Sequence, residues 1–406
     1  MSHFVQILIF LPVVGAVIGY TCKWVAIKML FHPARWIGVG PPRWRLGWQG
    51  VVQRRAPKFA SGVADTVAKT GVGVDTLLET IDPTQLAELL APHLQARGPA
   101  LTRAALEAIK PGVWDGLPQP VRDQMIGQLG PLTRPVVAAL VRDLRPVLRE
   151  VIDVRGLIVE QLSGANADRL ARLFQRVGRR ELQVVIWYGA VLGFLIGLLE
   201  VGGYAALEKW WLLPLIGAVD GLINNWFAIQ MIFRPLKRTY YLGVFPFQGL
   251  FPARQEEISR EYAAMLSTEV IGPKDLVAHV VAHGGDRLIA AATVTLEREL
   301  APLLTFAAMA AGTAPTPEVK ARVIAAVTAE ITTAAPAVIE ALDAPLRAQL
   351  GIADTLERSL AAMDKAEFER VLRGVFEEDE WILVALGGVL GGAIGTLQAA
   401  IVVAVG

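Results

Sequence analysis

The chain has 406 residues, of which 53% are hydrophobic and 19% are charged, and its mean hydropathy is +0.45. Soluble globular chains usually carry closer to a quarter of charged residues, so this composition favours a protein with several membrane spans. The net charge is +1, which gives no general attraction to nucleic acid, and we expect no such partner. The only cysteine, Cys22, excludes an internal disulfide and a cysteine-based metal cluster.

Four segments are long and apolar enough to cross a bilayer, which requires about 20 residues per helix. They are predicted within residues 1–34, 183–200, 210–234 and 382–406. The first lacks a basic start and leads into lysines, so we expect a retained span rather than a cleaved signal peptide.

The long connections, residues 35–182 and 235–381, have apolar side chains at three- and four-residue spacing, with Pro or Gly between the pieces. This pattern is typical of successive amphipathic helices, and Pro146 predicts a break or kink in one of them. We therefore expect an all-α polytopic membrane protein with about four transmembrane helices and two helical regions. Whether the wide apolar faces of these helices only pack together or also meet lipid stays open.

Basic residues set the predicted orientation. They follow the first span (Arg35, Arg43, Arg45, Arg54, Arg55, Lys58), precede the second (Arg176, Arg179, Arg180) and follow the third (Arg234, Lys237, Arg238). Both helical regions are thus predicted to be cytoplasmic, in a multi-pass membrane protein. The acidic run at 377–380 runs against this pattern, although acids carry little weight in the rule.

The first and third spans carry the same motif. Residues 11–35, LPVVGAVIGYTCKWVAIKMLFHPAR, align with residues 213–237, LPLIGAVDGLINNWFAIQMIFRPLK, with twelve identical positions and no gap. The second and fourth spans also match, with GAVLGFLIGLLE (189–200) aligned to GGVLGGAIGTLQ (387–398). A QG pair followed by Arg recurs after the first and after the third span. We interpret the chain as a tandem duplication whose corresponding spans point the same way, a parallel repeat.

Glycines at four-residue spacing give every span a face on which two helix backbones can approach closely. The predicted helix-packing residues are Gly15, Gly19, Gly189, Gly193, Gly197, Gly217, Gly221, Gly387, Gly391 and Gly395. Tight packing of the four spans is the simpler reading, and self-association of the chain through the same faces is compatible with it.

Three polar residues fall inside the third span, namely Asp220, Asn224 and Asn225. Ionisable groups in a span are costly and usually partnered. Asp220 aligns with Ile18 and Asn225 with Lys23, so we hypothesise that Lys23 and Asp220 pair in the bundle; solvated interfacial positions are the alternative.

The cytoplasmic ends of the first and third spans are predicted to contact lipid headgroups, because lysines there can extend toward the surface and tryptophans favour the interface. The predicted contacts are Lys23, Trp24, Lys28, Arg35, Arg43, Arg45, Arg54, Arg55, Trp226, Arg234 and Lys237.

Catalytic motifs are absent from the sequence: there is no glycine-rich phosphate loop, no HExxH and no GxSxG. His279 and His283, four residues apart with Asp286 nearby, allow a zinc-like site, but histidines before Gly284 and Gly285 are more often ordinary residues of a helix end. We expect no enzyme, no catalytic residues, no metal and no cofactor.

The repeated motif resembles the GxxxGxxTNWLAIKMLFRP signature of the DUF445 membrane proteins, a bacterial group that includes YheB- and YjiN-like proteins. The first copy matches at Gly15, Gly19, Trp24, Ala26, Ile27, Lys28, Met29, Phe31 and Pro33. The second matches at Gly217, Gly221, Asn225, Trp226, Ala228, Ile229, Met231, Phe233, Arg234 and Pro235. Departures are Lys23 for Asn, His32 for Arg and Gln230 for Lys. Each copy retains what the other has lost, so we expect the motif to act through both, while the family leaves the function open.

Two functions fit these patterns. The first is a non-enzymatic membrane scaffold whose cytoplasmic helical regions self-associate, organise lipid or bind partners of unknown identity. The alternative is a transporter or conduit for lipid or another apolar molecule that uses the repeated glycine-rich spans. Membrane lipid and further copies of the chain are the expected partners.

Overall fold

The structure is a computed structural model, and it describes residues 3–39, 46–207, 210–241, 243–310, 312–374 and 380–405. The chain forms two compact units. Unit 1 comprises Met1–Thr70, Ile158–Met265 and Leu356–Gly406, and unit 2 comprises Gly71–Leu157 and Leu266–Thr355. The sequence suggested one region from 35–182 and another from 235–381, but helices from the middle of each region pair with one another and make unit 2 together.

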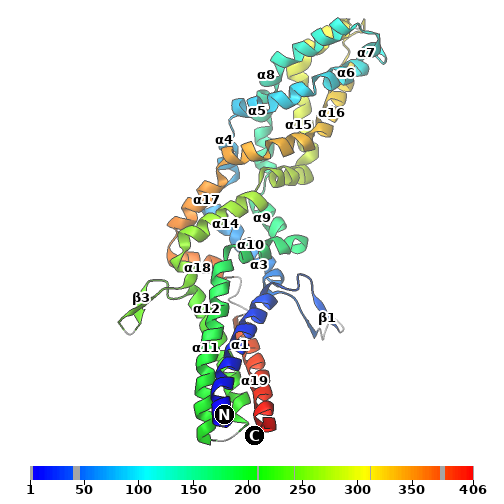
Figure 1. The fold of residues 1–406 in the computed structure, drawn as a ribbon. Helices are drawn as coiled ribbons and strands as arrows, with labels where there is room; N and C mark the ends of the chain where they lie inside the picture. The colour runs from blue at the N-terminus through cyan, green and yellow to red at the C-terminus, as the bar shows by residue number, and fades with distance from the viewer. Residues whose placement is uncertain are drawn as a thin grey trace. The chain divides into compact units, whose positions relative to one another are not determined.

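Four long helices of unit 1 make an antiparallel bundle (Figure 1). They are α1 (His3–Phe31), α11 (Arg179–Leu207), α12 (Leu212–Phe233) and α19 (Glu380–Val405). α1 packs on α11, α12 packs on α19, and contacts of α11 with α12 and of α1 with α19 close the ring. The helices are apolar all round and leave side chains such as Val17, Val191 and Leu215 exposed, which is the pattern of helices surrounded by lipid.

Among the residues that the structure describes, five helical stretches are long and apolar enough to cross a membrane. Four lie in this bundle: Pro12–Phe31, Arg179–Leu199, Leu212–Phe233 and Glu380–Ile401. The expected all-α membrane architecture is therefore confirmed. The fifth stretch, Pro317–Ala362, was not among the predicted spans. It includes α16 (Pro317–Leu350), which buries Val323 and Ile324 against other helices of unit 2.

Two short β-hairpins interrupt the helical pattern, and the sequence analysis did not predict them. β1 (Ile37–Val39) pairs antiparallel with β2 (Leu46–Trp48), with Ile37 opposite Trp48. β3 (Thr239–Tyr241) pairs with β4 (Phe245–Phe247), with Thr239 opposite Phe247. Each hairpin directly follows α1 or α12, so the two occupy equivalent places after the repeated motif (Figure 1).

Shorter helices complete unit 1 around the end of this bundle where α1 and α12 end. They are α2 (Val51–Arg54), α3 (Ala56–Lys69), η1 (Gly164–Asn166), α10 (Ala167–Val177), α13 (Leu250–Ala253) and α18 (Lys365–Arg373). α9 (Val154–Leu162), α14 (Gln255–Glu269) and α17 (Ile352–Ala362) are shared between the two units. Edge-to-face ring pairs fix the packing, with Phe59 and Phe174 centroids 4.8 Å apart and Phe233 and Phe251 centroids 5.4 Å apart.

Unit 2 is a helical bundle. Its helices are α4 (Val74–Thr80), α5 (Pro83–Ala96), α6 (Gly98–Ile109), α7 (Val113–Gly116), α8 (Gln119–Val151), α15 (Pro273–Ala310) and α16. Local signals place the ends: the Thr316 side chain caps α16, and Gly351 ends it in the left-handed conformation. α8 continues through Pro146, where the sequence predicted a break or kink, whereas α15 is interrupted at Gly284 (φ −151°, ψ 17°).

Candidate functional site

The predicted packing glycines lie face to face in two helix pairs. A Cβ added at Gly15 or Gly19 of α1 would meet the carbonyl oxygen of Gly193 or Gly189 of α11. The second pair repeats this arrangement, with Gly217 against Gly391 and Gly221 against Gly387, while Gly197 and Gly395 lie beside Gly15 and Gly217. The backbones of the paired helices are therefore in direct contact at these glycines.

Lys23 lies in the middle of the bundle and is only 3% exposed. Its Nζ donates a hydrogen bond to Oδ1 of Asn225, and Nδ2 of Asn225 donates to the carbonyl oxygen of Leu383 over 2.7 Å. Lys23 and Asn225 occupy the same position in the two copies of the motif. Gly189 leaves room for the Lys23 side chain, and its counterpart Gly387 leaves room for Asn225. The two copies therefore meet at their equivalent polar residues.

This arrangement corrects two expectations about Lys23. The side chain is buried, so it does not extend to lipid headgroups, and its hydrogen bond goes to Asn225 rather than to Asp220. Asp220 is half-buried and lies close enough to attract the ammonium electrostatically. Asn224 is also buried, and its Oδ1 accepts no hydrogen bond from the part of the chain that the structure describes.

Each copy of the motif is followed by a short hydrogen-bonded contact, the clasp, between the end of the span and the base of the hairpin. The Gly50 amide donates to the carbonyl oxygen of Pro33 (3.0 Å), and the Gly249 amide donates to that of Pro235 (2.9 Å). The preceding glutamines reinforce this contact, since Nε2 of Gln49 donates to Ala34 O (3.0 Å) and Nε2 of Gln248 donates to Leu236 O (2.7 Å). The repeated QG pair thus joins the hairpin base to the end of the span.

Most of the other predicted headgroup residues are exposed near the ends of the spans. Trp24 and Trp226 lie on the outer faces of α1 and α12, and the Lys28 Nζ is 4.8 Å from the centroid of the Trp24 ring. Exposed Arg35, Arg54, Arg234 and Lys237 and half-buried Arg55 complete the set. Arg43 and Arg45 lie outside the described residues.

The hairpins present large apolar side chains to the surroundings. In the first, Trp36, Ile37 and Val39 are exposed, Val39 by 85%; in the second, Tyr240, Tyr241, Val244 and Phe245 are exposed, Val244 by 71%. An isolated two-stranded hairpin is marginally stable in water, and a contiguous exposed apolar patch marks an interaction surface. Both hairpins begin just after the end of an apolar helix that is long enough to cross a membrane.

A groove of about 760 Å³ lies between α12 and the hairpin β3–β4. Its lining is mostly aromatic and apolar with one charged group: Trp226, Phe227, Gln230, Met231, Arg234, Pro235, Leu236, Tyr241 and Phe247. This apolar groove with a guanidinium at the end of a span is chemically complementary to a phospholipid, which combines an acyl chain with a phosphate.

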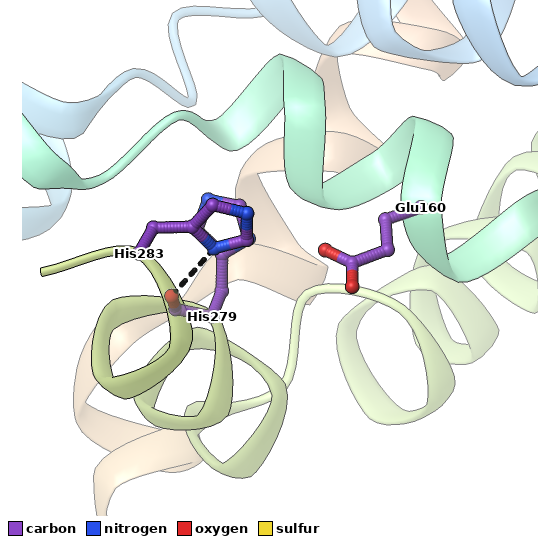
Figure 2. A group of neighbouring side chains, drawn as sticks. All are labelled: Glu160, His279 and His283. Carbon is purple, nitrogen blue, oxygen red and sulfur yellow. Dashed lines mark hydrogen bonds between the residues drawn. The ribbon is translucent and has the colours of Figure 1, made fainter. Parts of the chain in front are cut away.

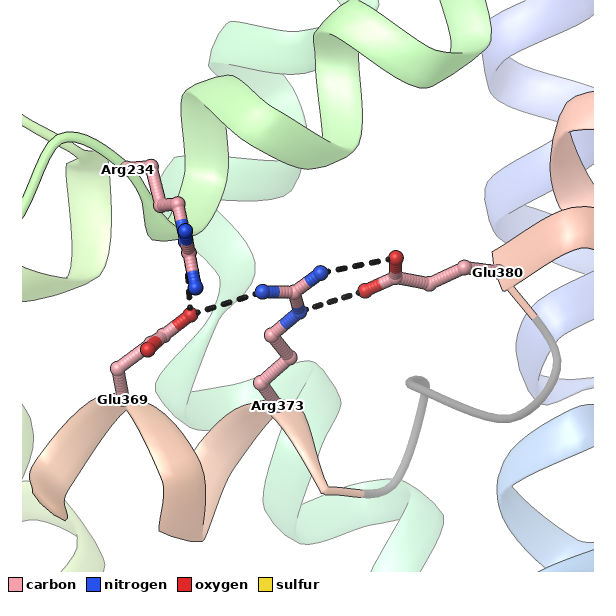
Figure 3. Close-up of polar contacts among 4 residues, drawn as sticks. All are labelled: Arg234, Glu369, Arg373 and Glu380. Carbon is pink, nitrogen blue, oxygen red and sulfur yellow. Dashed lines mark hydrogen bonds and ion pairs between the residues drawn. The ribbon is translucent and has the colours of Figure 1, made fainter. Parts of the chain in front are cut away.

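An ion network connects the end of α12 and the start of α19 to α18, as Figure 3 shows. Arg373 of α18 donates two hydrogen bonds to Glu380 at the start of α19, over 2.7 and 3.0 Å, and a third to Glu369 over 3.1 Å. Glu369 also accepts from Arg234 at the end of α12 over 3.4 Å. The carboxylates of Glu380 and Glu369 raise the pKa of Arg373, so this guanidinium stays charged. The network ties the ends of two spans to α18.

A second ionic contact fixes α11 to α14. Glu181, 2% exposed, accepts a hydrogen bond from Arg254, which also binds Glu257. Hydrogen bonds to Glu257 and Glu181 raise the pKa of Arg254, and Arg254 in turn lowers the pKa of Glu257. The Arg of the repeated QG…R pattern therefore has a structural partner in the second copy.

The two histidines of the zinc hypothesis lie on α15 in unit 2. Their ring centroids are 4.1 Å apart, and Nδ1 of His283 donates to the carbonyl oxygen of His279 over 2.9 Å (Figure 2). Asp286 lies on the same helix beyond the kink at Gly284, and Glu160, also drawn there, is a residue of unit 1. The two imidazoles supply two of the three or four protein ligands that a zinc ion takes.

Sequence reasoning missed the hairpin residues that line the groove, Tyr241 and Phe247. A signal for them was present, since TYYLGVFPF places two aromatic runs on either side of a Leu-Gly turn. From the sequence, residues 235–381 were instead predicted to be helical. The partner of Lys23 could not be read from the sequence, because it depends on how the two copies face each other.

The comparisons with known proteins found membrane proteins of Bacillus. The chain is 37% identical over 98 residues to a UPF0754 membrane protein of Bacillus licheniformis, covering 21% of this chain and 26% of that protein. It is 37% identical over 68 residues to UPF0754 membrane protein YheB of Bacillus subtilis, covering 16% and 18%. A UPF0754 membrane protein of Bacillus velezensis is 36% identical over 63 residues, covering 15% and 17%.

The similarity to YheB-like membrane proteins is therefore confirmed, and the chain matches about a quarter or less of the length of these relatives. No family model matches the chain. No solved structure matches it either.

Proposed function

We propose that this chain is a non-enzymatic membrane scaffold that binds phospholipid at the cytoplasmic end of its four spans. The basic residues around the ends of α1 and α12 support a cytoplasmic placement of the hairpins, in the inner membrane of a bacterium. Self-association of the chain is part of the proposal.

The observation that carries the proposal is the groove between α12 and the hairpin β3–β4. Its wall combines exposed aromatic rings, Trp226 at 53% exposure among them, with the guanidinium of Arg234. Aromatic side chains favour the interface between the acyl chains and the headgroups, and arginine binds phosphate with paired hydrogen bonds. The repeated clasp at Gly249 and Pro235 holds the hairpin beside the span and so keeps the groove open toward lipid.

The alternative, a conduit for an apolar molecule, finds less support in the spans. Glycine backbones in contact and the Lys23–Asn225 hydrogen bond fill the centre of the bundle. The observation that favours carriage of an apolar molecule is instead an apolar cavity in unit 2.

The test compares lipid binding by two variants of the full chain, each with one of two neighbouring tyrosines of β3 replaced. Tyr241 lines the groove, whereas Tyr240 does not, because consecutive side chains of a strand point to opposite faces. We expect native mass spectrometry of the full chain in mild detergent to show phosphatidylglycerol bound to the wild type. Tyr241→Ser is expected to weaken this binding about tenfold, the equivalent of a contact of about 1.4 kcal/mol, and Tyr240→Ser to leave it unchanged.

A second variant separates headgroup from acyl recognition. Arg234→Gln is expected to remove the preference for phosphatidylglycerol over phosphatidylcholine while weak binding of both lipids persists, since the aromatic wall is intact. The same spectra count the copies of the chain in each particle. Equal lipid binding by the wild type and both Tyr241→Ser and Arg234→Gln would contradict the groove as the lipid site, and a strictly monomeric particle would contradict self-association.

A further inference from the structure

The helices of unit 2 form an apolar cavity that is open to the surface on one side. This cavity of about 290 Å³ lies among α5, α6, α8, α15 and α16, with walls formed by side chains such as Leu101, Leu106, Val136, Leu140, Leu300 and Val327. Its polar lining residues are few: Gln95, Thr102, Gln128 and Thr133. The Thr102 hydroxyl already donates to the carbonyl oxygen of Gly98 over 2.8 Å. The lining among the described residues therefore carries no charged side chain and offers almost only apolar contact.

Two glycines lie at the open side of the cavity. Gly127 and Gly130 of α8 line it, and a Cβ added at either glycine would meet no atom within 4 Å. Gly127 is exposed and Gly130 is half-buried, so both border the mouth of the cavity. A larger side chain at either position would therefore narrow the mouth without a clash.

We infer that this cavity binds one acyl chain of a lipid or fatty acid. The almost wholly apolar lining offers few hydrogen-bond partners for the polar groups of a peptide. A thin, flexible hydrocarbon chain fits a narrow apolar cavity and needs no polar partner along its length. The same chain carries membrane-spanning helices, so lipid is the most abundant apolar molecule around it. The site is separate from the groove of unit 1 and does not depend on it.

The test uses photolabelling of the full-length protein in mild detergent. The probe is a palmitic acid analogue with a diazirine at the methyl end, and the labelled peptides are identified by mass spectrometry. We expect labels on α5, α6, α8 and α15 within the cavity lining, and competition by unlabelled palmitate but not by butyrate, which has the same carboxylate and only a short chain. Gly130→Leu and Gly127→Leu, which narrow the mouth, are expected to reduce labelling at least tenfold.

A matched variant controls for the substitution itself. Gly62→Leu places the same side chain on α3 of unit 1, where an added Cβ also meets nothing within 4 Å, and it is expected to label like the wild type. Thermal unfolding checks the fold: Gly130→Leu should unfold at or above the wild-type temperature, but palmitate should no longer raise that temperature. Undiminished labelling of the cavity in a folded Gly130→Leu protein, or labels confined to other surfaces, would overturn the assignment.

Discussion

At the scale of single residues, the unusual feature is a lysine buried inside a membrane bundle. An ammonium group is costly in such a place unless hydrogen bonds replace its hydration. Asn225 provides the acceptor from the other copy of the motif, and Leu383 holds the Asn225 amide through its carbonyl oxygen. The pair explains why the two copies differ at this position: identical residues, two lysines or two asparagines, would not form the same charged hydrogen bond.

The first prediction tests this pair. Asn225→Leu leaves the buried ammonium of Lys23 without its acceptor, and we expect it to lower the free energy of unfolding by about 3–5 kcal/mol. The double variant Lys23→Met with Asn225→Leu removes charge and acceptor together and should recover most of that loss. Thermal unfolding in detergent measures both. Lys28→Met, on an exposed lysine of the same helix, should change the stability by less than about 0.5 kcal/mol. A double variant no more stable than Asn225→Leu alone would show that the pair does not have this role.

At the scale of helices and strands, the glycine contacts decide how close the spans lie. Gly19→Leu would drive a side chain into the backbone of α11 at Gly189, and the two helices must separate. We expect a loss of at least about 1–3 kcal/mol, the usual cost of overpacking. Gly62→Leu makes the same change on an open helix face and should be neutral or slightly stabilising, because leucine favours the helix over glycine. Unfolding temperatures that are equal for the two variants would contradict the close packing.

The ion pair between Arg254 and Glu257 at the start of α14 predicts that stability depends on pH. Arg254 lowers the pKa of Glu257 below its ordinary value of 4.5, so the folded protein binds this proton less readily than the unfolded chain does. The contribution of Glu257 to stability is then complete above about pH 4.5 and disappears as the pH falls through the lowered pKa.

The difference in unfolding temperature between the wild type and Glu257→Gln should therefore be constant from about pH 7 to 5 and close below about pH 4. Glu256→Gln, a change of the neighbouring carboxylate on the same helix, is the matched control. A difference that widens toward low pH would have the opposite sign to the one this ion pair requires.

The elements show where sequence reasoning suffices. Composition placed the four spans because an apolar run of about 20 residues has few alternatives, and the glycine spacing anticipated which backbones touch. The hairpins were missed because each strand has only three residues and most of its apolar side chains face outward, so no buried alternation marks them. The partner of Lys23 was assigned to Asp220 instead of Asn225, because position along one helix does not reveal which residue faces it across a bundle.

At the scale of the whole molecule, two regions that are separate in sequence combine their helices in unit 2, while the repeated spans and hairpins belong to unit 1. Pairing of α6 with α16 and of α8 with α15 could not be inferred from amphipathic patterns, which indicate that a face is buried but not against what. The same ambiguity applies to Pro317–Ala362, whose hydropathy suits a membrane span although its helix α16 buries apolar residues among the other helices of unit 2.

The central claim is that four spans anchor the chain and that the two helical regions between the spans, residues 35–182 and 235–381, lie in the cytoplasm. It is tested most directly by adding single cysteines in a Cys22→Ser background and labelling right-side-out and inside-out vesicles with a membrane-impermeant maleimide. Arg287→Cys and Arg370→Cys flank the Pro317–Ala362 stretch, and Trp210→Cys lies between α11 and α12. We predict that the first two react only in inside-out vesicles and Trp210→Cys only in right-side-out vesicles. Labelling of Arg287→Cys and Arg370→Cys from opposite sides would make Pro317–Ala362 a fifth span and contradict the account.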